Sequence, residues 1–462
     1  MVFIGTPDRL LGARKSAHLL CFGPRVRYVG LYARMNETDT ALAPIHDPYA
    51  ALRQPGYRRY LAGWIVALLG QQIQSVAIGW QLFDRTGDAL VLGWVGLVQA
   101  LPVIVLAIPA GQLSDKRSRR TILMVTMVAA AFCSLGLALL SWRTGPVWAY
   151  YTVLAAGATA NAVGWPARAA LVPQLVPTEQ MANAITWNST TFQLACIVGP
   201  GLGGLIVAYS ATAGYVLAAL CYGLFAGFLA FVALRPATRS REPVSWKSLI
   251  AGVHFVHRQK AILATITLDL VAVLLGGATY LLPVFAKDIL HAGPTEFGWL
   301  RAAPSVGALV MAMAMAHLPP ARYAGRAMLW AVAGFGVATV VFGLSHNLWL
   351  SLAMLFLTGL FDNISVVVRH TLVQVLTPDE MRGRVSAVNT IFIGASNELG
   401  GFESGLTARL FGPVLSVVGG GLGALLATVW TAWQWPQIRA IGALHEVKPA
   451  EEPDVLRRRA PK

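Results

Sequence analysis

Four carboxylic acids lie inside long apolar stretches of the sequence, where a charged group is costly. They are Asp269, Asp362, Glu398 and Glu403. A charge at membrane depth costs about 2.5–3.5 kcal/mol on insertion scales, so such a residue is a functional hypothesis by default. Apolar surroundings favour the protonated form of a carboxyl group, and a change in its solvation changes its protonation. These acids are therefore candidates to carry a proton. The alternative is a buried carboxyl that hydrogen-bonds to a Ser, an Asn or a backbone group.

The four acids can be ranked as proton-coupling candidates by how deep each lies within its apolar stretch. Glu398 lies about fourteen residues into its stretch, which is near the midplane of a bilayer at 1.5 Å rise per residue. Glu403 lies about 7 Å further along and is turned by about 140°, so the two do not share a helix face. We rank Asp362 and Glu398 first for proton coupling, then Asp269, and then Glu403.

Several other polar residues in these stretches are candidates to contact a small molecule. Gln71, Gln74 and Ser75 fall within about one helical turn, although packing between helices is an equal explanation. The remaining candidates are Asn161, Trp165, Asn363, Arg369 and Asn397. For Arg168 and Arg369, snorkelling at a helix end or pairing between helices explains the residues at least as well.

The elements that would position these residues are membrane-spanning helices. The chain has 56% hydrophobic and only 12% charged residues, about half the charge fraction of a soluble domain. Its apolar stretches of about 20 residues can each cross a bilayer as a helix, and they lack the alternation of barrel strands. We predict an all-α membrane protein with twelve spans, near residues 57–83, 91–113, 121–142, 147–174, 182–209, 212–234, 261–286, 296–318, 326–345, 347–375, 384–410 and 413–436.

The net charge of +15 does not indicate a nucleic-acid partner, because the basic residues cluster in alternate loops. Loops such as 116–120 and 235–260 are rich in Lys and Arg, whereas 209–214 on the opposite side has none. This pattern follows the positive-inside rule and predicts a lipid bilayer as partner, with both termini in the cytoplasm. Asp84 and Asp88 fall in the first outer loop, where solvent exposure is the simplest explanation.

An internal repeat divides the chain into halves of six spans each. RAALVPQLVPTEQM (168–181) resembles RHTLVQVLTPDEM (369–381), and at an offset of 201 residues Arg168 matches Arg369. A Leu-Val pair, a proline and a glutamate match as well, and chance similarity between apolar helices does not explain the shared Arg, Pro and Glu. Parallel halves related by an axis along the membrane normal are a transporter architecture.

The loop after the second span, GQLSDKRSRRTIL (111–123), resembles the G-x-x-x-D-x-x-x-R-R motif of the major facilitator superfamily. Gly111 would allow close helix approach, and Asp115 would sit against a helix N-terminus or a nearby Arg. The resemblance implies that the motif latches the two halves on the cytoplasmic side. The implied latch residues are Gly111, Asp115, Arg119, Arg120 and Arg168. The matching loop of the second half, 317–329, keeps an Arg but lacks the acid, which would make the latch one-sided.

A narrower resemblance connects the chain to the siderophore-exporter branch of that superfamily, which contains the enterobactin exporter. Residues 268–290, 298–309 and 382–405 carry it, and IVGPGLGGL (197–205) resembles a Gly-Pro motif typical of antiporters. The resemblance implies proton-driven export of a siderophore-like metabolite or a drug, by alternating access, from a monomer in the bacterial inner membrane. The identity of the cargo stays open.

The predicted organisation follows from these patterns. Residues 1–46 form a basic N-terminal arm, unless translation starts at Met35, and 47–234 form the first six-helix bundle. The linker 235–260 contains WKSLIAGVHFVHR, whose apolar spacing predicts an amphipathic helix on the cytoplasmic surface. The second bundle spans 261–436 and a cytoplasmic tail spans 437–462.

Two other classes of protein are alternatives to a transporter. A membrane-embedded enzyme would need a nucleophile with a base or clustered ligands, but no GxSxG or HExxH occurs, and His254 and His257 have no acidic third ligand nearby. The four cysteines lack metal-ligand spacing, so neither a metal nor another cofactor is expected. No filter-like repeated loop indicates a channel. A non-transporting sensor remains the alternative.

Overall fold

The computed structural model describes residues 47–232, 246–317 and 323–442, and its helices belong to one compact unit that begins at Tyr49. The predicted N-terminal arm with Met35 lies outside the described residues. So do the first part of the predicted linker and most of the predicted tail.

Long helices make up nearly all of the described chain. The first half contains α1 (Pro55–Thr86), α2 (Ala89–Lys116), α3 (Arg119–Trp142), α4 (Val147–Leu171), α5 (Met181–Tyr209) and α6 (Ala211–Ala230). The second half contains α7 (Trp246–Arg258), α8 (Lys260–Leu275), α9 (Ala278–Val284), the π-helical η4 (Phe285–Ile289), α10 (Pro294–His317), α11 (Ala324–Leu344), α12 (Leu348–Leu376), α13 (Asp379–Phe411), α14 (Pro413–Gln434) and the short α15 (Pro436–Ala440). Within the described residues, ten segments are long and apolar enough to cross a bilayer. With α4 and α13, which pack among them, the arrangement is consistent with twelve spans.

The seventh predicted span is interrupted, which hydropathy alone did not indicate. Where a continuous helix was predicted over 261–286, α8 ends at Leu275 and α9 begins at Ala278, with η4 following. Of the two glycines between them, Gly276 lies close to Phe335 of α11 and Gly277 to α13, where a Cβ on Gly277 would come within 2.7 Å of the Gly400 carbonyl oxygen. Broken helices of this kind are tolerated at membrane depth where neighbouring protein surrounds them.

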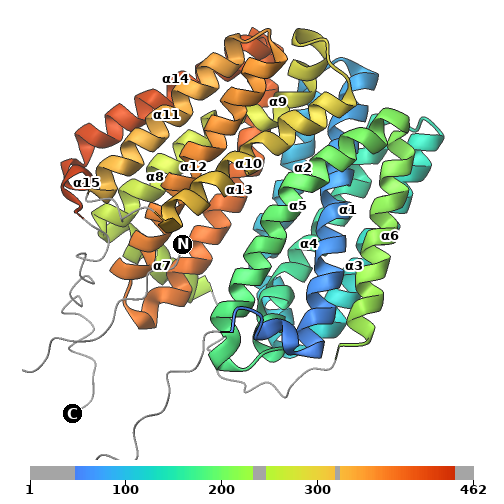
Figure 1. Cartoon of the computed structure of the whole chain (residues 1–462), viewed down its shortest axis with the longest axis horizontal. Coiled ribbons are helices and arrows are strands. Elements are labelled where there is room, and N and C mark those ends of the chain that lie inside the picture. The colour runs from blue at the N-terminus through green and yellow to red at the C-terminus, as the bar shows by residue number, and fades with distance from the viewer. Residues whose placement is uncertain (1–46, 233–245, 318–322, 443–462) are drawn as a thin grey trace, which may run out of the picture. The chain divides into compact units, whose positions relative to one another are not determined.

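The helices pack as two groups, one from each half of the chain (Figure 1). In the first group α1 packs against α5 and α6, α3 against α4 and α6, and α2 against α4. In the second group α10 and α11 pack against α12, α11 against α14, and α8 against α13 and α14. The groups meet mainly through two pairs, α2 with α13 and α5 with α10.

Glycines face each other where these two pairs cross. A Cβ on Gly405 would lie 2.7 Å from the Cα of Gly93, at the crossing of α13 and α2. A Cβ on Gly298 would lie 3.0 Å from the Cα of Gly204, at the crossing of α10 and α5. Small residues let the backbones of membrane helices approach closely, so these crossings hold the halves together through backbone contact.

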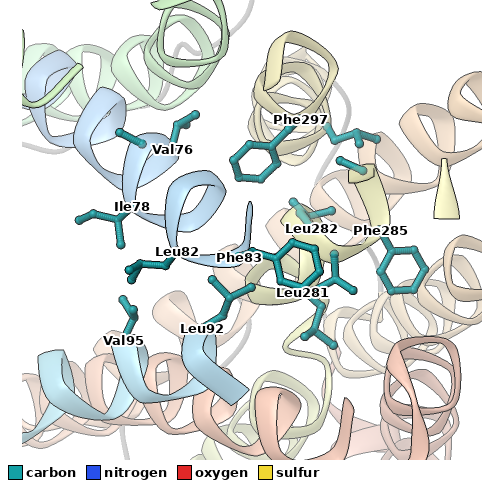
Figure 2. Packing of buried hydrophobic residues seen from close by; sticks show 14 of the residues in the cluster. Val76, Ile78, Leu82, Phe83, Leu92, Val95, Leu281, Leu282, Phe285 and Phe297 are labelled. Atoms are coloured by element: carbon teal, nitrogen blue, oxygen red, sulfur yellow. The ribbon is translucent and has the colours of Figure 1, made fainter. Parts of the chain in front are cut away.

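The buried apolar clusters differ between the two ends of the molecule. At the predicted outer end, one cluster joins both halves: α1 and α2 contribute Val76 and Leu92 among others, and α9, η4 and α10 contribute Leu281, Phe285 and Phe297 (Figure 2). At the predicted cytoplasmic end, a cluster of α1 and α3–α6 residues with the connecting segments belongs to the first half alone, and the other clusters belong to the second half alone. Buried apolar contact therefore closes the predicted outer end and not the other.

The predicted amphipathic helix is present as α7, over Trp246–Arg258. Its Phe255 and Val256 are buried with Val385 against the second half, while Ile250 and Val253 are exposed. Thus α7 is fastened to the second half by one face and leaves apolar side chains on another.

Candidate functional site

A cavity of about 340 Å³ opens within the second half. Its walls come from α8–α13, and they carry Asp269, Tyr280, Arg301, Asp362 and Asn397. Three of these residues were predicted from the sequence. The fold brings them together from segments that are far apart in the chain, because the helices of this half converge on the cavity.

Asp269 and Arg369 form a salt bridge between α8 and α12. Both residues are buried, with 7% and 3% exposure. From the sequence, Asp269 is a candidate for proton coupling and Arg369 is a candidate contact for a small molecule, with pairing between helices as the alternative for the arginine. The structure favours the pairing, because the two buried side chains form an ion pair. Removing either partner would leave the other as an uncompensated buried charge.

Asp362 is not part of that ion pair. It lines the cavity with Ser365, and it makes no hydrogen bond or ion pair with any residue that the structure describes. The buried Oδ1 of its neighbour Asn363 is likewise without a hydrogen-bond partner. Asp362 is therefore the carboxylate of this cavity that no partner among the described residues holds.

Glu398 belongs to a polar cluster at the contact between the halves. The Tyr280 hydroxyl donates a 2.6 Å hydrogen bond to Glu398 Oε2. Arg301 lies close enough to interact electrostatically with both, and it donates a 2.7 Å hydrogen bond across the halves to Ser75 Oγ on α1. Sequence reasoning missed Arg301, although an arginine inside an apolar span is itself a signal.

Glu403, on the same helix as Glu398, has different surroundings. Its Oε2 accepts a 3.5 Å hydrogen bond from the adjacent Ser404, and it is not part of the cavity wall. The prediction that the two glutamates face different ways agrees with this geometry.

A second cavity, of about 480 Å³, lies in the first half near the predicted cytoplasmic end. The Arg168 guanidinium carbon lies 4.1 Å from the centre of the Trp64 ring and 4.4 Å from that of Trp165. Tyr60 and Asn188 share the wall with Arg168. Arg168 was predicted as a latch residue beside Asp115, but the structure places it against two aromatic rings instead.

The other predicted latch residues are not joined to one another in this structure. Asp115 is exposed and has no partner among the described residues, and a Cβ on Gly111 would meet nothing within 4 Å. Arg119 donates to the Ala170 carbonyl at the end of α4, at 2.8 Å, and Arg120 donates to the Val232 carbonyl after α6, at 3.1 Å. The expected close approach at Gly111 is absent among the described residues, and no buried apolar cluster joins the halves at this end.

The remaining predicted contact residues are scattered. Gln74 accepts a hydrogen bond from Ser134 on α3, which supports packing between helices, the alternative weighed for it. Asn397 donates to the Ile393 carbonyl of its own helix, at 3.0 Å, while Gln71 and Asn161 are exposed. Within the described ranges, no group of three His, Cys, Asp or Glu residues could hold a metal ion.

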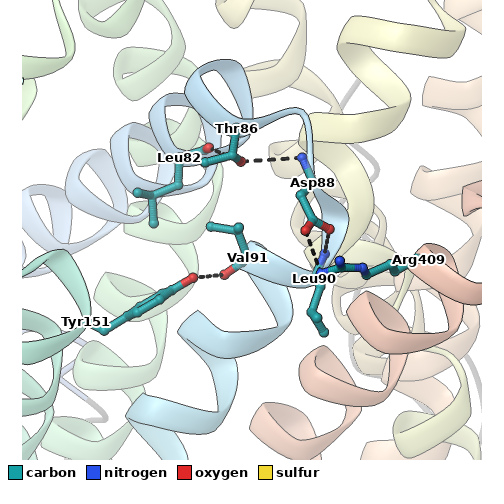
Figure 3. Close-up of polar contacts among 7 residues, drawn as sticks. All are labelled: Leu82, Thr86, Asp88, Leu90, Val91, Tyr151 and Arg409. Carbon is teal, nitrogen blue, oxygen red and sulfur yellow. Dashed lines mark hydrogen bonds and ion pairs between the residues drawn. The ribbon is translucent and has the colours of Figure 1, made fainter. Parts of the chain in front are cut away.

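Two ion pairs connect the halves at the predicted outer end. Asp84 at the end of α1 pairs with Lys287 of η4, at 2.6 Å. Asp88, which also caps the N-terminus of α2, pairs with Arg409 of α13, at 2.8 Å (Figure 3). The sequence explained both acids by solvent exposure alone. That interpretation was incomplete, because only the fold brings cations of the second half beside them.

Comparison with known proteins identifies a family that matches this chain. Residues 46–456 match the model of a family described as transmembrane secretion effector. The chain is 28% identical over 355 residues to the multidrug efflux pump Tap of Mycolicibacterium fortuitum, covering 73% of this chain and 85% of that protein. It is 26% identical over 381 residues to the enterobactin exporter EntS of Shigella boydii serotype 4, covering 81% and 90%.

Solved structures agree with the fold. A bacterial homolog of the human lysosomal transporter Spinster, inward-facing and occupied, matches with a TM-score of 0.69 at 11% identity, over 85% of this chain and 99% of that one. A bacterial homologue of the iron transporter ferroportin matches with a TM-score of 0.59 at 14% identity, over 82% and 98%. With its family match and its relatives, this chain is a multi-pass membrane transporter, not an enzyme, and it belongs to the transmembrane secretion effector family of the major facilitator superfamily.

Proposed function

We propose that this transporter is a proton-coupled exporter that moves a siderophore-like metabolite or a drug by alternating access. The names of its relatives support both kinds of cargo, because one is a multidrug efflux pump and another an enterobactin exporter. The alternate placement of basic loops supports a bacterial inner-membrane protein with both termini in the cytoplasm. It acts as a monomer, because each chain carries both halves of the rocking unit.

The conformation supports alternating access. The halves are joined at the predicted outer end by one apolar cluster and two ion pairs, whereas the clusters at the other end stay separate. This is the arrangement expected of a state open to the cytoplasm, ready to take up cargo. In the opposite state the loop with Asp115 would come against the second half, and it would then act as the latch.

The observation that carries the proposal is the hydrogen bond from Arg301 to Ser75 beside the Glu398–Tyr280 pair. This bond crosses the two halves, so a rocking motion must break it and free Arg301 to move. Because Arg301 interacts with Glu398, the charge state of Glu398 is coupled to the position of the halves. Asp362, which has no partner among the described residues, would carry the exchanged proton in the cavity that Arg301 also lines.

Proton flux in proteoliposomes tests the proposal. The purified transporter is reconstituted with the pH dye pyranine inside, and enterobactin is added under an imposed pH gradient. We expect enterobactin to stimulate proton movement in the wild type, and we expect Asp362→Asn and Glu398→Gln to abolish this stimulation while the protein remains inserted. Glu403→Gln, the same change five residues along the same helix, should retain it.

Wild-type proton movement in both Asp362→Asn and Glu398→Gln would remove these residues from coupling. An enterobactin transport rate that is the same with and without the imposed pH gradient would contradict proton coupling itself. Binding of enterobactin, or of a panel of efflux-pump drugs, with no movement of any of them in sealed vesicles would identify a sensor instead of a transporter.

A further inference from the structure

We propose that the cavity formed by Tyr60, Trp64, Arg168 and Asn188 binds an organic anion, a carboxylate or sulfonate attached to a planar apolar body. This inference rests on the proposed function, because the anion would be the cargo at the point where it enters from the predicted cytoplasmic end. The charge of Arg168, its aromatic neighbours and two unpaired polar atoms carry the argument.

The internal repeat shows what is unusual about Arg168. Its counterpart Arg369 is neutralised by Asp269 on α8, the first spanning helix of the second half. In the first half, the residue of α1 that contacts Arg168 is Trp64. The first spanning helix therefore offers the repeat-matched arginine a carboxylate in the second half and an aromatic ring in the first half. An aromatic face attracts a guanidinium but leaves its net charge uncompensated.

The described lining around Arg168 contains no acid that could serve instead. It forms no ion pair and no hydrogen bond with any residue that the structure describes. None of the residues that line its cavity is acidic, whereas the cavity of the second half contains Asp269 and Asp362. A cation without a partner in a low-dielectric site is costly, and an anionic ligand would supply the missing charge.

Two buried polar atoms in the same wall also lack partners. The Tyr60 hydroxyl and the Asn188 Oδ1 lie close enough to interact with each other, but neither meets the geometry of a hydrogen bond with a described residue. Tyr60 is fully buried, with 0% exposure, and lines the cavity. An unpaired buried polar group costs about 1–3 kcal/mol. A ligand that accepts a hydrogen bond from Tyr60 and an ion pair from Arg168 would satisfy both groups at once.

The shape of the lining indicates what the anion is attached to. The N–H donors of a guanidinium lie in its plane, so ring contacts on its faces leave these donors free to bind a carboxylate or sulfonate in bidentate fashion. Apolar side chains of α5, Ile185 and Phe192, lie in the same cavity wall and are 56% and 53% exposed. Such a wall accommodates an apolar, planar body beside the charged group.

The two cavities would then have different functions in the two halves. The anion binds in the first half, against an arginine without a carboxylate, and the proton is exchanged in the second half, at acids. Keeping the two apart prevents the cargo anion from facing the carboxylates of the second cavity at short range, where like charges repel.

A matched pair of small ligands tests the site. Binding of 2-naphthoate and of its uncharged analogue 2-naphthamide to the full-length protein in detergent is measured by calorimetry, without any gradient. We expect naphthoate to bind the wild type at least about tenfold more tightly than naphthamide, as a charge-assisted hydrogen bond would provide. Arg168→Gln should remove this preference, and Arg168→Lys should retain part of it.

Two further variants separate ligand binding from structure. Arg326→Gln removes an arginine that lies over the ring of Tyr323 at 4.9 Å and outside both cavities, and it should leave the preference unchanged. Tyr60→Phe should weaken naphthoate binding several-fold and yet leave the melting temperature equal or higher, because the hydroxyl that it removes has no partner.

Equal affinity for naphthoate and naphthamide in the wild type would overturn the proposal, as would an unchanged preference in Arg168→Gln. Binding of dihexanoyl-phosphatidylglycerol, but not of naphthoate, in an Arg168-dependent manner would overturn it in favour of a lipid headgroup. These results are independent of coupling: loss of cargo-driven proton flux with naphthoate binding intact would refute the proposed function and leave this site standing.

Discussion

The ion pairs at the predicted outer end offer a direct test of the alternating-access interpretation. Asp84→Asn together with Asp88→Asn removes both pairs that connect the halves there. The side chains of Asp84 and Lys287 are 50% and 39% exposed, and those of Asp88 and Arg409 are 32% and 56% exposed. Solvent therefore screens both pairs, and each belongs to the class worth about 0.2–1 kcal/mol.

The size of the effect follows from these values. Losing both pairs weakens closure by about 0.4–2 kcal/mol, which at RT of about 0.59 kcal/mol shifts the ratio of outer-open to outer-closed molecules about 2- to 30-fold. The apolar cluster and the glycine crossings remain, so we expect a shift in population without unfolding. High salt should produce part of the same shift in the wild type, because the Debye length falls to about 3 Å at 1 M.

Distances between spin labels measure this shift. Tyr209→Cys and His346→Cys, in a background without native cysteines, place labels on exposed residues at the outer end of each half. We expect the fraction of long distances to grow in the Asp84→Asn, Asp88→Asn variant. The control variant is Asp288→Asn with Glu296→Gln, which removes the same number of charges at this end. Glu296 accepts a hydrogen bond from the Gly293 N–H, so this contact stays within the second half.

The reasoning would be refuted if the double variant and this control gave the same distance distribution. A second refutation would come from exchanging the charges. Asp84→Lys with Lys287→Asp should restore the wild-type distribution at the first pair, and failure to do so would show that closure does not depend on the contact.

Three further predictions follow from the packing. Gly298→Ala places a methyl group against the backbone of α5. We expect it to reduce the free energy of unfolding by about 1–3 kcal/mol and so to lower the melting temperature in detergent. Gly223→Ala, whose Cβ would meet nothing within 4 Å, should leave the melting temperature close to that of wild type. Asp269→Asn leaves Arg369 buried without its partner and should cost about 3–5 kcal/mol in thermal unfolding, while Asp269→Leu with Arg369→Met should recover most of that loss; an equally unstable double variant would contradict this. Asp115→Asn should slow turnover in proteoliposomes without changing stability, because no described residue pairs with its carboxylate in this state. Unchanged kinetics would contradict the latch.

Local properties of the sequence determined much of this protein. Hydropathy located the spans, apolar spacing located α7 at Trp246–Arg258, and the repeat at an offset of 201 residues indicated the two halves. The motif at 111–123 indicated the superfamily, to which the chain belongs. Each of these signals is contained within one segment, or in a comparison of two segments, so no knowledge of helix rotation or crossing is needed to detect it.

The partners of the polar residues were decided only by the tertiary structure. Arg301 reaches Ser75 across 226 residues of chain and Lys287 reaches Asp84 across 203, and the repeat-matched arginines 168 and 369 meet a tryptophan and an aspartate respectively. A side chain's partner depends on how its helix is rotated and on which helix crosses it, and a difference of one residue changes the direction by about 100°. Hydropathy averages over that rotation, so it places a charge at membrane depth without saying what neutralises it.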